Sequence, residues 1–202
     1  MLTSAELLRP IDPEAPLLVV ATRAEAEHLG SDYPLLLTGI GRIRTAVALT
    51  EVLARGPLPR EIINIGTAGA LSKRCEDAGV YHVGSVSLHD FSHSAIKKLT
   101  GQTAYPNLTI SHAPEAVRLT TGDVFVEDAT LRRRLAKYAD IVDMEGYAIA
   151  WVARRFDLPV SLIKMVSDQA NKNAGKLWAE GVEECSKVMG AYLQQAEASD
   201  QE

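Results

Sequence analysis

Short apolar runs alternate along this chain with segments whose apolar residues recur at helical spacing, and this alternation limits the possible folds more than any other feature. Residues 16–22 (PLLVVAT) have the pattern of a buried strand, and residues 34–41 (PLLLTGIG) that of a second strand ending in glycines. Residues 42–56 then place Ala, Val and Leu at helical spacing before a Gly that ends the helix. Strand–helix–strand order with short connections predicts an α/β layered domain around a largely parallel sheet.

The alternation continues along the rest of the chain without an internal repeat. A helical turn is expected at 25–29, further strands at 61–71, 79–90, 116–126, 140–144 and 159–168, and helices at 127–139, 145–156 and from about Lys176 to Ala196. The last residues, EASDQE, have the composition of a frayed polar tail. We therefore expect one domain over residues 1–202, with an ordered core from about 16 to 196.

The composition excludes several classes of protein. The 202 residues are 47% apolar and 23% charged, with a net charge of −5, so no basic face for nucleic acid is expected. No apolar stretch approaches the roughly 20 residues of a membrane span, and the N-terminus lacks a secretory pattern. Cys75 and Cys185 have neither paired spacing nor an activating neighbour, which predicts no disulfide and no zinc site. A cytoplasmic domain is the expectation.

Polar and glycine-rich segments follow the expected strands. In α/β folds ligands gather at the carboxyl ends of strands, so these segments should meet at one edge of the sheet. They are Glu25, GIG at 39–41, GTAGA at 66–70, TGDVFV at 121–126, DMEG at 143–146 and VSDQAN at 166–171.

Several of these candidates have a structural interpretation beside the functional one. The small residues of GTAGA could let the backbone approach an anion or a ribose, or could form only a tight turn; they match neither a P-loop nor a dinucleotide fingerprint. Asp168 could be a general acid with a pKa raised by burial, a helix N-cap, or the partner of Lys164 in an ion pair. Phe125 could be a ligand platform or a core residue.

Two more groups of polar residues stand out. His89 and His93 have a spacing that binds metal on a helix, but they lie with Asp90 in an expected loop without a third good ligand, so no metal is expected. Asp143 and Glu145 flank Met144 where a strand passes into a helix. Burying an unpaired charge costs several kcal/mol, roughly, so both carboxylates should be paired, hydrated or used in chemistry.

Four motifs together resemble a known family. INIGTAGAL, TGDVFV, VDMEGYAIA and MVSDQAN, in this order, resemble the nucleoside phosphorylase/nucleosidase superfamily, and most closely its methylthioadenosine/S-adenosylhomocysteine nucleosidases. The resemblance covers roughly residues 16–195. It implies a three-layer α/β/α sandwich with a central mixed, largely parallel sheet, a homodimer, and no metal or organic cofactor.

The resemblance also implies roles for individual residues. Asp168 matches the general acid that protonates purine N7, and Glu145 the carboxylate that holds the ribose 2′-hydroxyl. Met144 matches the residue packed against the sugar, Phe125 the ring that stacks on the purine, and Val126 the residue whose backbone reads the base edge.

The resemblance implies further roles, including that of the residue that orients the attacking water. Glu25 falls where the family places the carboxylate that orients the attacking water. Thr67 stands at a serine position in the loop that also contains Ala68 and Gly69. Lys164 stands where the nucleosidases commonly have an arginine, and Ser167 joins Asp168 among the expected substrate-binding residues. No role transfers to Asp143, which is expected to orient a loop or cap the following helix.

These residue types suit cleavage of an N-glycosidic bond, which passes through an oxocarbenium-like state. An acid beside the base, a carboxylate under the sugar and a carboxylate that holds water meet its three needs. Phosphorolysis would need Arg or Lys donors at the glycine-rich loop. Asn64 stands where the bacterial phosphorylases carry an arginine, and Glu25 would repel phosphate, although Arg42 and Arg44 leave an anion site open.

The identity of the substrate stays open at this level. Residues 88–115 depart from the nucleosidase pattern, so methylthioadenosine, S-adenosylhomocysteine, futalosine and plain purine nucleosides all remain candidates. A purine nucleosidase is the leading hypothesis. A futalosine hydrolase, a purine nucleoside phosphorylase and a catalytically silent nucleoside-binding module are the alternatives.

Overall fold

The computed structural model describes residues 5–30, 32–75 and 79–200. Its helices are α1 (Arg23–Ala26), α2 (Arg42–Arg55), α3 (His93–Thr100), α4 (Ala129–Leu135), α5 (Gly146–Arg155) and α6 (Ala174–Asp200), with a 3₁₀ turn at Lys73–Cys75. Its strands are β1 (Glu6–Leu7), β2 (Leu17–Val20), β3 (Leu35–Leu37), β4 (Ile62–Ala70), β5 (Val80–Leu88), β6 (Leu108–Thr109), β7 (Val117–Thr121), β8 (Ile141–Asp143) and β9 (Val160–Asp168).

The strands form one mixed sheet, as the sequence predicted. β2 pairs in parallel with β3 and β4, β4 with β9, and both β5 and β8 with β7. Antiparallel ladders join β1 to β3, β4 to β8, β5 to β6 and β5 to β9. β4 thus pairs with β2, β8 and β9, and its carboxyl end reaches the ends of β8 and β9.

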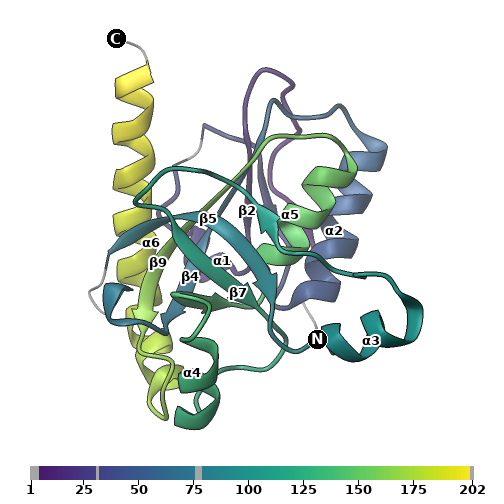
Figure 1. The fold of residues 1–202 in the computed structure, drawn as a ribbon. Helices are drawn as coiled ribbons and strands as arrows, with labels where there is room; N and C mark the ends of the chain where they lie inside the picture. Colours follow the sequence, from purple (N-terminus) through teal and green to yellow (C-terminus); the bar gives the residue numbers. More distant parts are fainter. Residues whose placement is uncertain (1–4, 31, 76–78, 201–202) are drawn as a thin grey trace.

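Helices cover both faces of this sheet (Figure 1). On one face α5 lies against the strands with α2 beside it, over a core that includes Leu49, Leu53 and Ile149. On the other face α6 packs on β4 and β9 and also contacts α1, over a core that includes Ile65, Ile163 and Met189. β2 has all four residues buried, as expected for a strand covered on both sides.

Three sequence predictions differ from the structure. β7 ends at Thr121, so residues 122–126 are not strand: the Gly122 N–H makes the last bond to β8, at Asp143 O (3.1 Å), and the Asp123 N–H turns to Asp90 Oδ2 (2.8 Å). The loop expected around His93 begins a helix, α3, which ends at Gly101 with a φ of 72°. α6 continues to Asp200, past the end expected near Ala196; residues 201–202 lie outside the described part.

Short pairings explain what the sequence pattern missed. β1 and β6 have two residues each, too few for a period-two signal, and β1 pairs ahead of the expected core start at residue 16. α3 has eight residues, about two turns, which is too short for its apolar positions, Ile96 and Leu99, to distinguish a helix from a loop. Within the described residues, no helix has both the length and the apolar character needed to cross a bilayer.

Candidate active site

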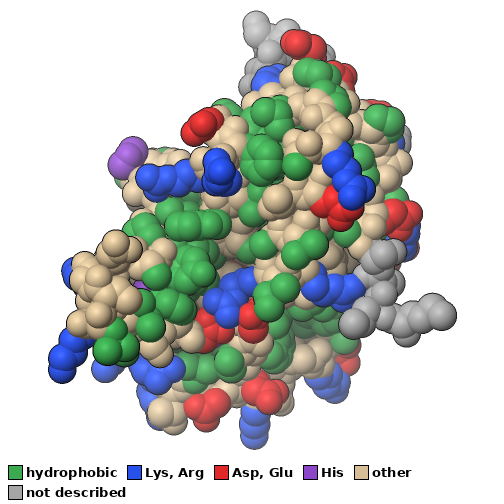
Figure 2. All heavy atoms as spheres, turned by 90° about the vertical axis from the view of Figure 1, so that its right-hand side faces the viewer, with side chains coloured by type: hydrophobic (Ala, Val, Ile, Leu, Met, Phe, Trp, Pro, Cys, Tyr) green, Lys and Arg blue, Asp and Glu red, His purple; other side chains and the backbone are tan. Residues whose placement is uncertain are grey.

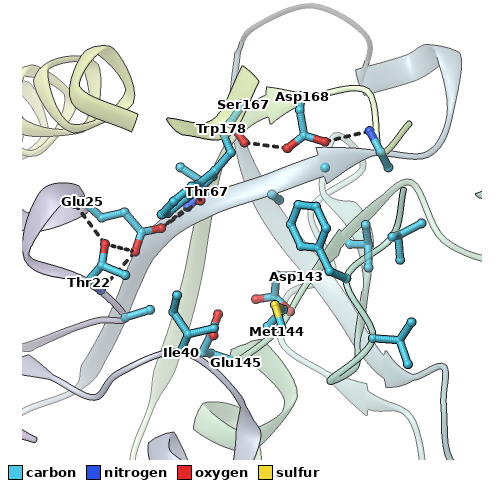
Figure 3. Close-up of a pocket in the computed structure, with 18 residues that line it drawn as sticks. Thr22, Glu25, Ile40, Thr67, Asp143, Met144, Glu145, Ser167, Asp168 and Trp178 are labelled. Carbon is cyan, nitrogen blue, oxygen red and sulfur yellow. Dashed lines mark hydrogen bonds between the residues drawn. The ribbon is translucent and has the colours of Figure 1, made fainter. Parts of the chain in front are cut away.

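A cavity of about 170 Å³ opens where β2, β4, β8 and β9 end. Figure 3 shows acidic side chains on separate walls of this cavity, with Asp168 on one side, Glu25 on a second and Glu145 beside Met144 on a third. The structure therefore brings together segments that are far apart in the sequence. The predicted site residues that line the cavity are Glu25, Thr67, Ala68, Gly69, Phe125, Val126, Met144, Glu145, Ser167 and Asp168.

Asp168 reaches the cavity because of an irregularity in β9. Along the β4–β9 ladder, Ala68 pairs with Val166 but Gly69 pairs with Asp168, so Ser167 is an extra residue that re-aims the strand end. Asp168 Oδ1 accepts from the Ala170 N–H (2.7 Å) and Oδ2 from the Ser167 hydroxyl (2.9 Å). Asp168 therefore caps a tight turn and is not the N-cap of α6, which begins at Ala174.

The environment of Asp168 suits a proton donor. Burial raises the pKa of Asp168 above its ordinary value, and the hydrogen bonds from Ala170 and Ser167 act in the opposite direction. A carboxyl group with a raised pKa keeps its proton closer to neutral pH, so this side chain can act as a general acid.

Glu25 lies at the start of α1 and accepts four hydrogen bonds. Oε1 accepts from the Thr67 N–H (2.9 Å) and the Thr67 hydroxyl (2.8 Å), and Oε2 from the Thr22 N–H (3.1 Å) and the Thr22 hydroxyl (2.9 Å). The Glu25 N–H donates back to Thr22 Oγ1 at 3.3 Å, which completes a capping box. The carboxylate is buried and fixed in one orientation, facing the cavity.

Glu145 and Asp143 have different surroundings. Glu145 Oε1 accepts from the Gly41 N–H (2.7 Å), which ties the start of α2 to the start of α5. Asp143 accepts from the Gly146 N–H (2.9 Å) and the Thr121 hydroxyl (2.6 Å), so its side chain caps the first N–H of α5, one of the two roles that the sequence left open. Burial, followed by the repulsion of Asp143, raises the pKa of Glu145 to about 8, although Lys164 and the Gly41 N–H oppose the shift.

Lys164 is paired with Asp143, not with Asp168. Its Nζ lies 2.8 Å from Asp143 Oδ2, and both side chains are 1% exposed. The ion pair with Asp168 that the strand periodicity allowed is therefore wrong: the bulge at Ser167 breaks the period-two relation between the two residues. Burial opposes the charge on Lys164, but Asp143, Glu145 and Glu25 together raise its pKa above the ordinary value. Lys164 is not among the lining residues and acts from behind the cavity wall.

The glycines of GTAGA make room for carboxylates. A Cβ at Gly66 would lie 3.3 Å from Glu25 Oε1 and 3.5 Å from Lys164 Nζ. A Cβ at Gly69 would lie 3.2 Å from Asp168 Oδ1. The small residues of this segment therefore allow two acidic side chains to approach β4 closely.

The apolar part of the cavity comes from loops. Phe125 is 43% exposed, which favours the ligand-platform interpretation over a place in the core, whereas Val126 is buried. Met144 lies between the two carboxylates of its motif and also lines the cavity. A flat exposed ring beside backbone groups suits a planar heterocycle.

The histidine motif contributes to packing. His93 Nε2 is 3.1 Å from the Leu88 carbonyl, and Asp90 forms an ion pair with Arg42 (2.8 Å). Arg42 also pairs with Asp123 at 2.7 Å, so three segments around the cavity mouth are held together by this cation. In the described part of the chain, no three His, Cys, Asp or Glu side chains are grouped as a metal ion would require.

Sequence reasoning missed some residues of the site. Thr22 had a signal, since a Thr three residues before a Glu is the pattern of a capping box. Ile40 belongs to the GIG segment that the sequence placed at this edge of the sheet, but the residue itself was not identified as part of the site, and it lines the cavity. Trp178 lines it from α6 and donates to Thr67 Oγ1 (2.9 Å); no motif identified this residue.

Comparison with known proteins places the chain in a family. A family model described as the phosphorylase superfamily matches residues 21–196. The chain belongs to this superfamily. The resemblance found in the four motifs is thereby confirmed.

Relatives within the superfamily support the nucleosidase branch. A protein of Marinomonas sp. named 5′-methylthioadenosine/S-adenosylhomocysteine nucleosidase is 26% identical over 189 residues, which cover 82% of this chain and 80% of the relative. A protein of Bacillus subtilis with the same name is 28% identical over 169 residues, covering 73% of each chain.

Two solved structures share the fold. A Helicobacter pylori 5′-methylthioadenosine/S-adenosylhomocysteine nucleosidase with butyl-thio-DADMe-Immucillin-A has a TM-score of 0.78 at 18% identity, covering 90% of this chain and 97% of that one. Futalosine hydrolase of the same organism has a TM-score of 0.77 at 18% identity, covering 90% of this chain and 96% of that one.

Proposed function

We propose that this protein hydrolyses the N-glycosidic bond of a purine ribonucleoside of the methylthioadenosine/S-adenosylhomocysteine type, releasing the free purine and the ribose moiety. The observation that carries the proposal is the convergence of Asp168, Glu145 and Glu25 on one cavity from β9, the start of α5 and α1. Curated relatives with nucleosidase names support the same reaction.

Asp168 and its neighbours act on the purine base. Asp168 donates its proton to purine N7, and the raised pKa of this buried carboxyl keeps that proton available. Phe125 stacks on the purine ring, the backbone of Val126 contacts the base edge, and Ser167 holds Asp168 in position through its 2.9 Å hydrogen bond. Protonation turns the purine into a neutral leaving group.

The sugar and the nucleophile lie toward the other two carboxylates. Glu145 binds the ribose 2′-hydroxyl with Met144 packed beside the sugar, and the positive charge that develops on the ribose stabilises the Glu145 carboxylate. Glu25 orients the attacking water. Thr67, Ala68 and Gly69 form the floor between these groups.

The charges around the cavity favour water over phosphate. No Arg or Lys stands among its lining residues in the described chain. Arg42 is engaged by Asp90 and Asp123, Lys164 by Asp143, and the amide of Asn64 donates to the Val19 carbonyl (2.9 Å). An anion would meet several carboxylates without a matching cation, so phosphorolysis is the weaker alternative.

A substrate panel tests the proposal. We expect free purine from methylthioadenosine or S-adenosylhomocysteine at a rate that does not depend on phosphate. Adenosine, inosine and futalosine complete the panel, each with and without phosphate. Preference for futalosine would assign the protein to the second candidate, whose solved representative shares the fold equally well. Release that requires phosphate would identify a phosphorylase, and binding without release a nucleoside-binding module.

Substitution of Glu145 by Gln tests the ribose contact. Gln keeps an oxygen for the Gly41 N–H but cannot become a carboxylate as positive charge develops on the ribose. We therefore expect kcat/KM for a ribonucleoside to fall about ten- to a hundredfold, the worth of a hydrogen bond to a charged group. The 2′-deoxy analogue should lose much less. Equal losses on both substrates would contradict the 2′-hydroxyl contact.

Glu145→Gln should also change how the stability of the protein depends on pH. The pKa of Glu145 lies above its ordinary value of 4.5, at about 8, so the folded protein retains a proton that the unfolded chain has lost between these limits. This contribution to stability is complete below the lower limit and is lost as pH rises through the upper one. We expect Glu145→Gln to flatten the fall in Tm of the unliganded protein as pH rises between these two limits, from 4.5 to about 8.

Three further expectations accompany this proposal. We take the helices on the two faces of the sheet as the outer layers of the α/β/α arrangement.

We infer a homodimer in which a second copy covers the apolar residues beside the cavity: Ile40, Ile43 and Val47 are 47%, 75% and 61% exposed. Figure 2 looks onto this side of the molecule and shows hydrophobic side chains gathered between charged ones. Light scattering measures the oligomeric state, and a cytoplasmic location stays a prediction of the sequence.

A further inference from the structure

An unassigned hydrogen-bond relay connects α6 to the carboxylate of Glu25. The Trp178 indole N–H donates to Thr67 Oγ1 at 2.9 Å, and the Thr67 hydroxyl donates to Glu25 Oε1 at 2.8 Å. Figure 3 shows Trp178, Thr67 and Glu25 together along one wall of the cavity, apart from Asp168. The three residues come from α6, β4 and α1, so only the tertiary structure brings them into contact.

Chemistry fixes the direction of this relay. An indole N–H can only donate, and a threonine hydroxyl has a single proton with two lone pairs. Because Thr67 Oγ1 accepts from Trp178, its own proton is free to point at Glu25.

The opposite side of Glu25 has the same design. Thr22 Oγ1 accepts from the Glu25 backbone N–H (3.3 Å) and donates to Glu25 Oε2 (2.9 Å). Each oxygen of the carboxylate therefore receives a hydroxyl proton whose direction is set by a second donor. On the Thr22 side that donor is backbone and comes with the capping box; on the Thr67 side it is the side chain of Trp178.

We propose that Trp178 is a positioning residue that orients the Thr67 hydroxyl toward Glu25 and thereby holds this carboxylate in place for the attacking water. The inference rests on the proposed role of Glu25. Without the indole N–H, the Thr67 hydroxyl can rotate toward water or substrate, and Glu25 loses one of the four donors that fix it. Since α6 begins just after the turn capped by Asp168, the relay also links the segment beside the acid to the carboxylate across the cavity.

Kinetics of Trp178→Phe measure the contribution of the relay. The variant keeps an aromatic ring but loses the N–H, and we expect kcat to fall about three- to tenfold with KM within about twofold, as for the loss of one hydrogen bond. The chain has two Trp residues, and Trp151→Phe is the matched control. Trp151 stacks on Tyr147 in α5 (centroids 6.0 Å apart) and does not line the cavity, so its replacement should leave both constants within about twofold.

A double-mutant cycle separates positioning from packing. Thr67→Val removes the hydroxyl through which Trp178 acts, so adding Trp178→Phe to Thr67→Val should lower kcat little further. Additive losses in kcat, or a raised KM with unchanged kcat, would overturn the proposal and make Trp178 only a wall of the cavity.

A spectroscopic readout is independent of activity. A ¹H–¹⁵N spectrum contains one indole resonance from Trp178 and one from Trp151. We expect the Trp178 N–H to exchange slowly with solvent and its resonance to move in Thr67→Val, while that of Trp151 stays in place. An unprotected Trp178 N–H that Thr67→Val does not affect would refute the relay even in an active enzyme. A protected, Thr67-dependent N–H in a protein that cleaves no nucleoside would retain the relay and reject the proposed function instead.

Discussion

Replacement of Asp168 by Asn should lower kcat about 10²- to 10⁴-fold, the range that general acid catalysis contributes. Asn keeps an oxygen for the Ala170 N–H and a polar group beside the Ser167 hydroxyl, so the turn and the cavity should persist. What the variant lacks is the proton that the proposed mechanism transfers from the buried carboxyl to the purine. Steady-state kinetics on the best substrate of the panel measure the loss of kcat. Calorimetric titration with the purine product tests whether the cavity persists.

Ser167→Ala is the matched control for this prediction. In the wild type, the Ser167 hydroxyl donates to Asp168 Oδ2 and thereby lowers the pKa of Asp168. The variant removes this hydroxyl and leaves the acid itself in place. We expect a modest change in kcat and an upward shift of the pH at which the acid loses its proton. Near-wild-type turnover by Asp168→Asn would refute the acid role of Asp168.

Replacement of Lys164 by Met should destabilise the protein by about 3–5 kcal/mol, the usual effect of breaking a buried ion pair from one side. The cation is 1% exposed and 2.8 Å from Asp143, with Glu145 and Glu25 as its other charged neighbours. Without it the Asp143 carboxylate would remain buried with no matching cation. The loss in the free energy of unfolding can be measured by urea denaturation at neutral pH.

Two control variants distinguish charge from packing at this position. Lys164→Arg keeps a cation at this position, and it should retain most of the stability if the larger guanidinium group fits. Adding Asp143→Asn to Lys164→Met removes the partner charge as well and should recover part of the loss. A loss below about 1 kcal/mol in Lys164→Met would mean that the buried pair contributes little.

Local pattern predicted much of the fold and the candidate site. Apolar runs such as residues 16–22 and 61–71 contain β2 and β4, because buried strands need continuous apolar side chains. The cavity lies at the carboxyl ends of the strands as expected. GTAGA, expected as a loop after its strand, forms instead the last residues of β4, and Asp168 is the last residue of β9. The pattern overextended β7 because VFV at 124–126 alternates like a strand. The Gly122 N–H makes the last bond to β8, at Asp143 O, and the Asp123 N–H turns away to the side chain of Asp90.

Pairing between distant residues was beyond the sequence. From the sequence, Lys164 could have paired with Asp168. In the structure a one-residue bulge at Ser167 separates these two side chains, and Lys164 pairs with Asp143. Trp178 had no motif at all, because its importance depends on the path of α6 across β4.

By itself the sequence determined which residue types follow each strand, and hence the family and the chemistry available. Only the tertiary structure decided that Asp143 pairs with Lys164 and caps α5, and that Glu145 faces the cavity. It also decided that Trp178 is linked to Glu25 through Thr67. The physical reason is range: strand and helix periodicity act over a few residues, whereas hydrogen bonds and ion pairs depend on positions within about 3–4 Å that only the packed chain defines.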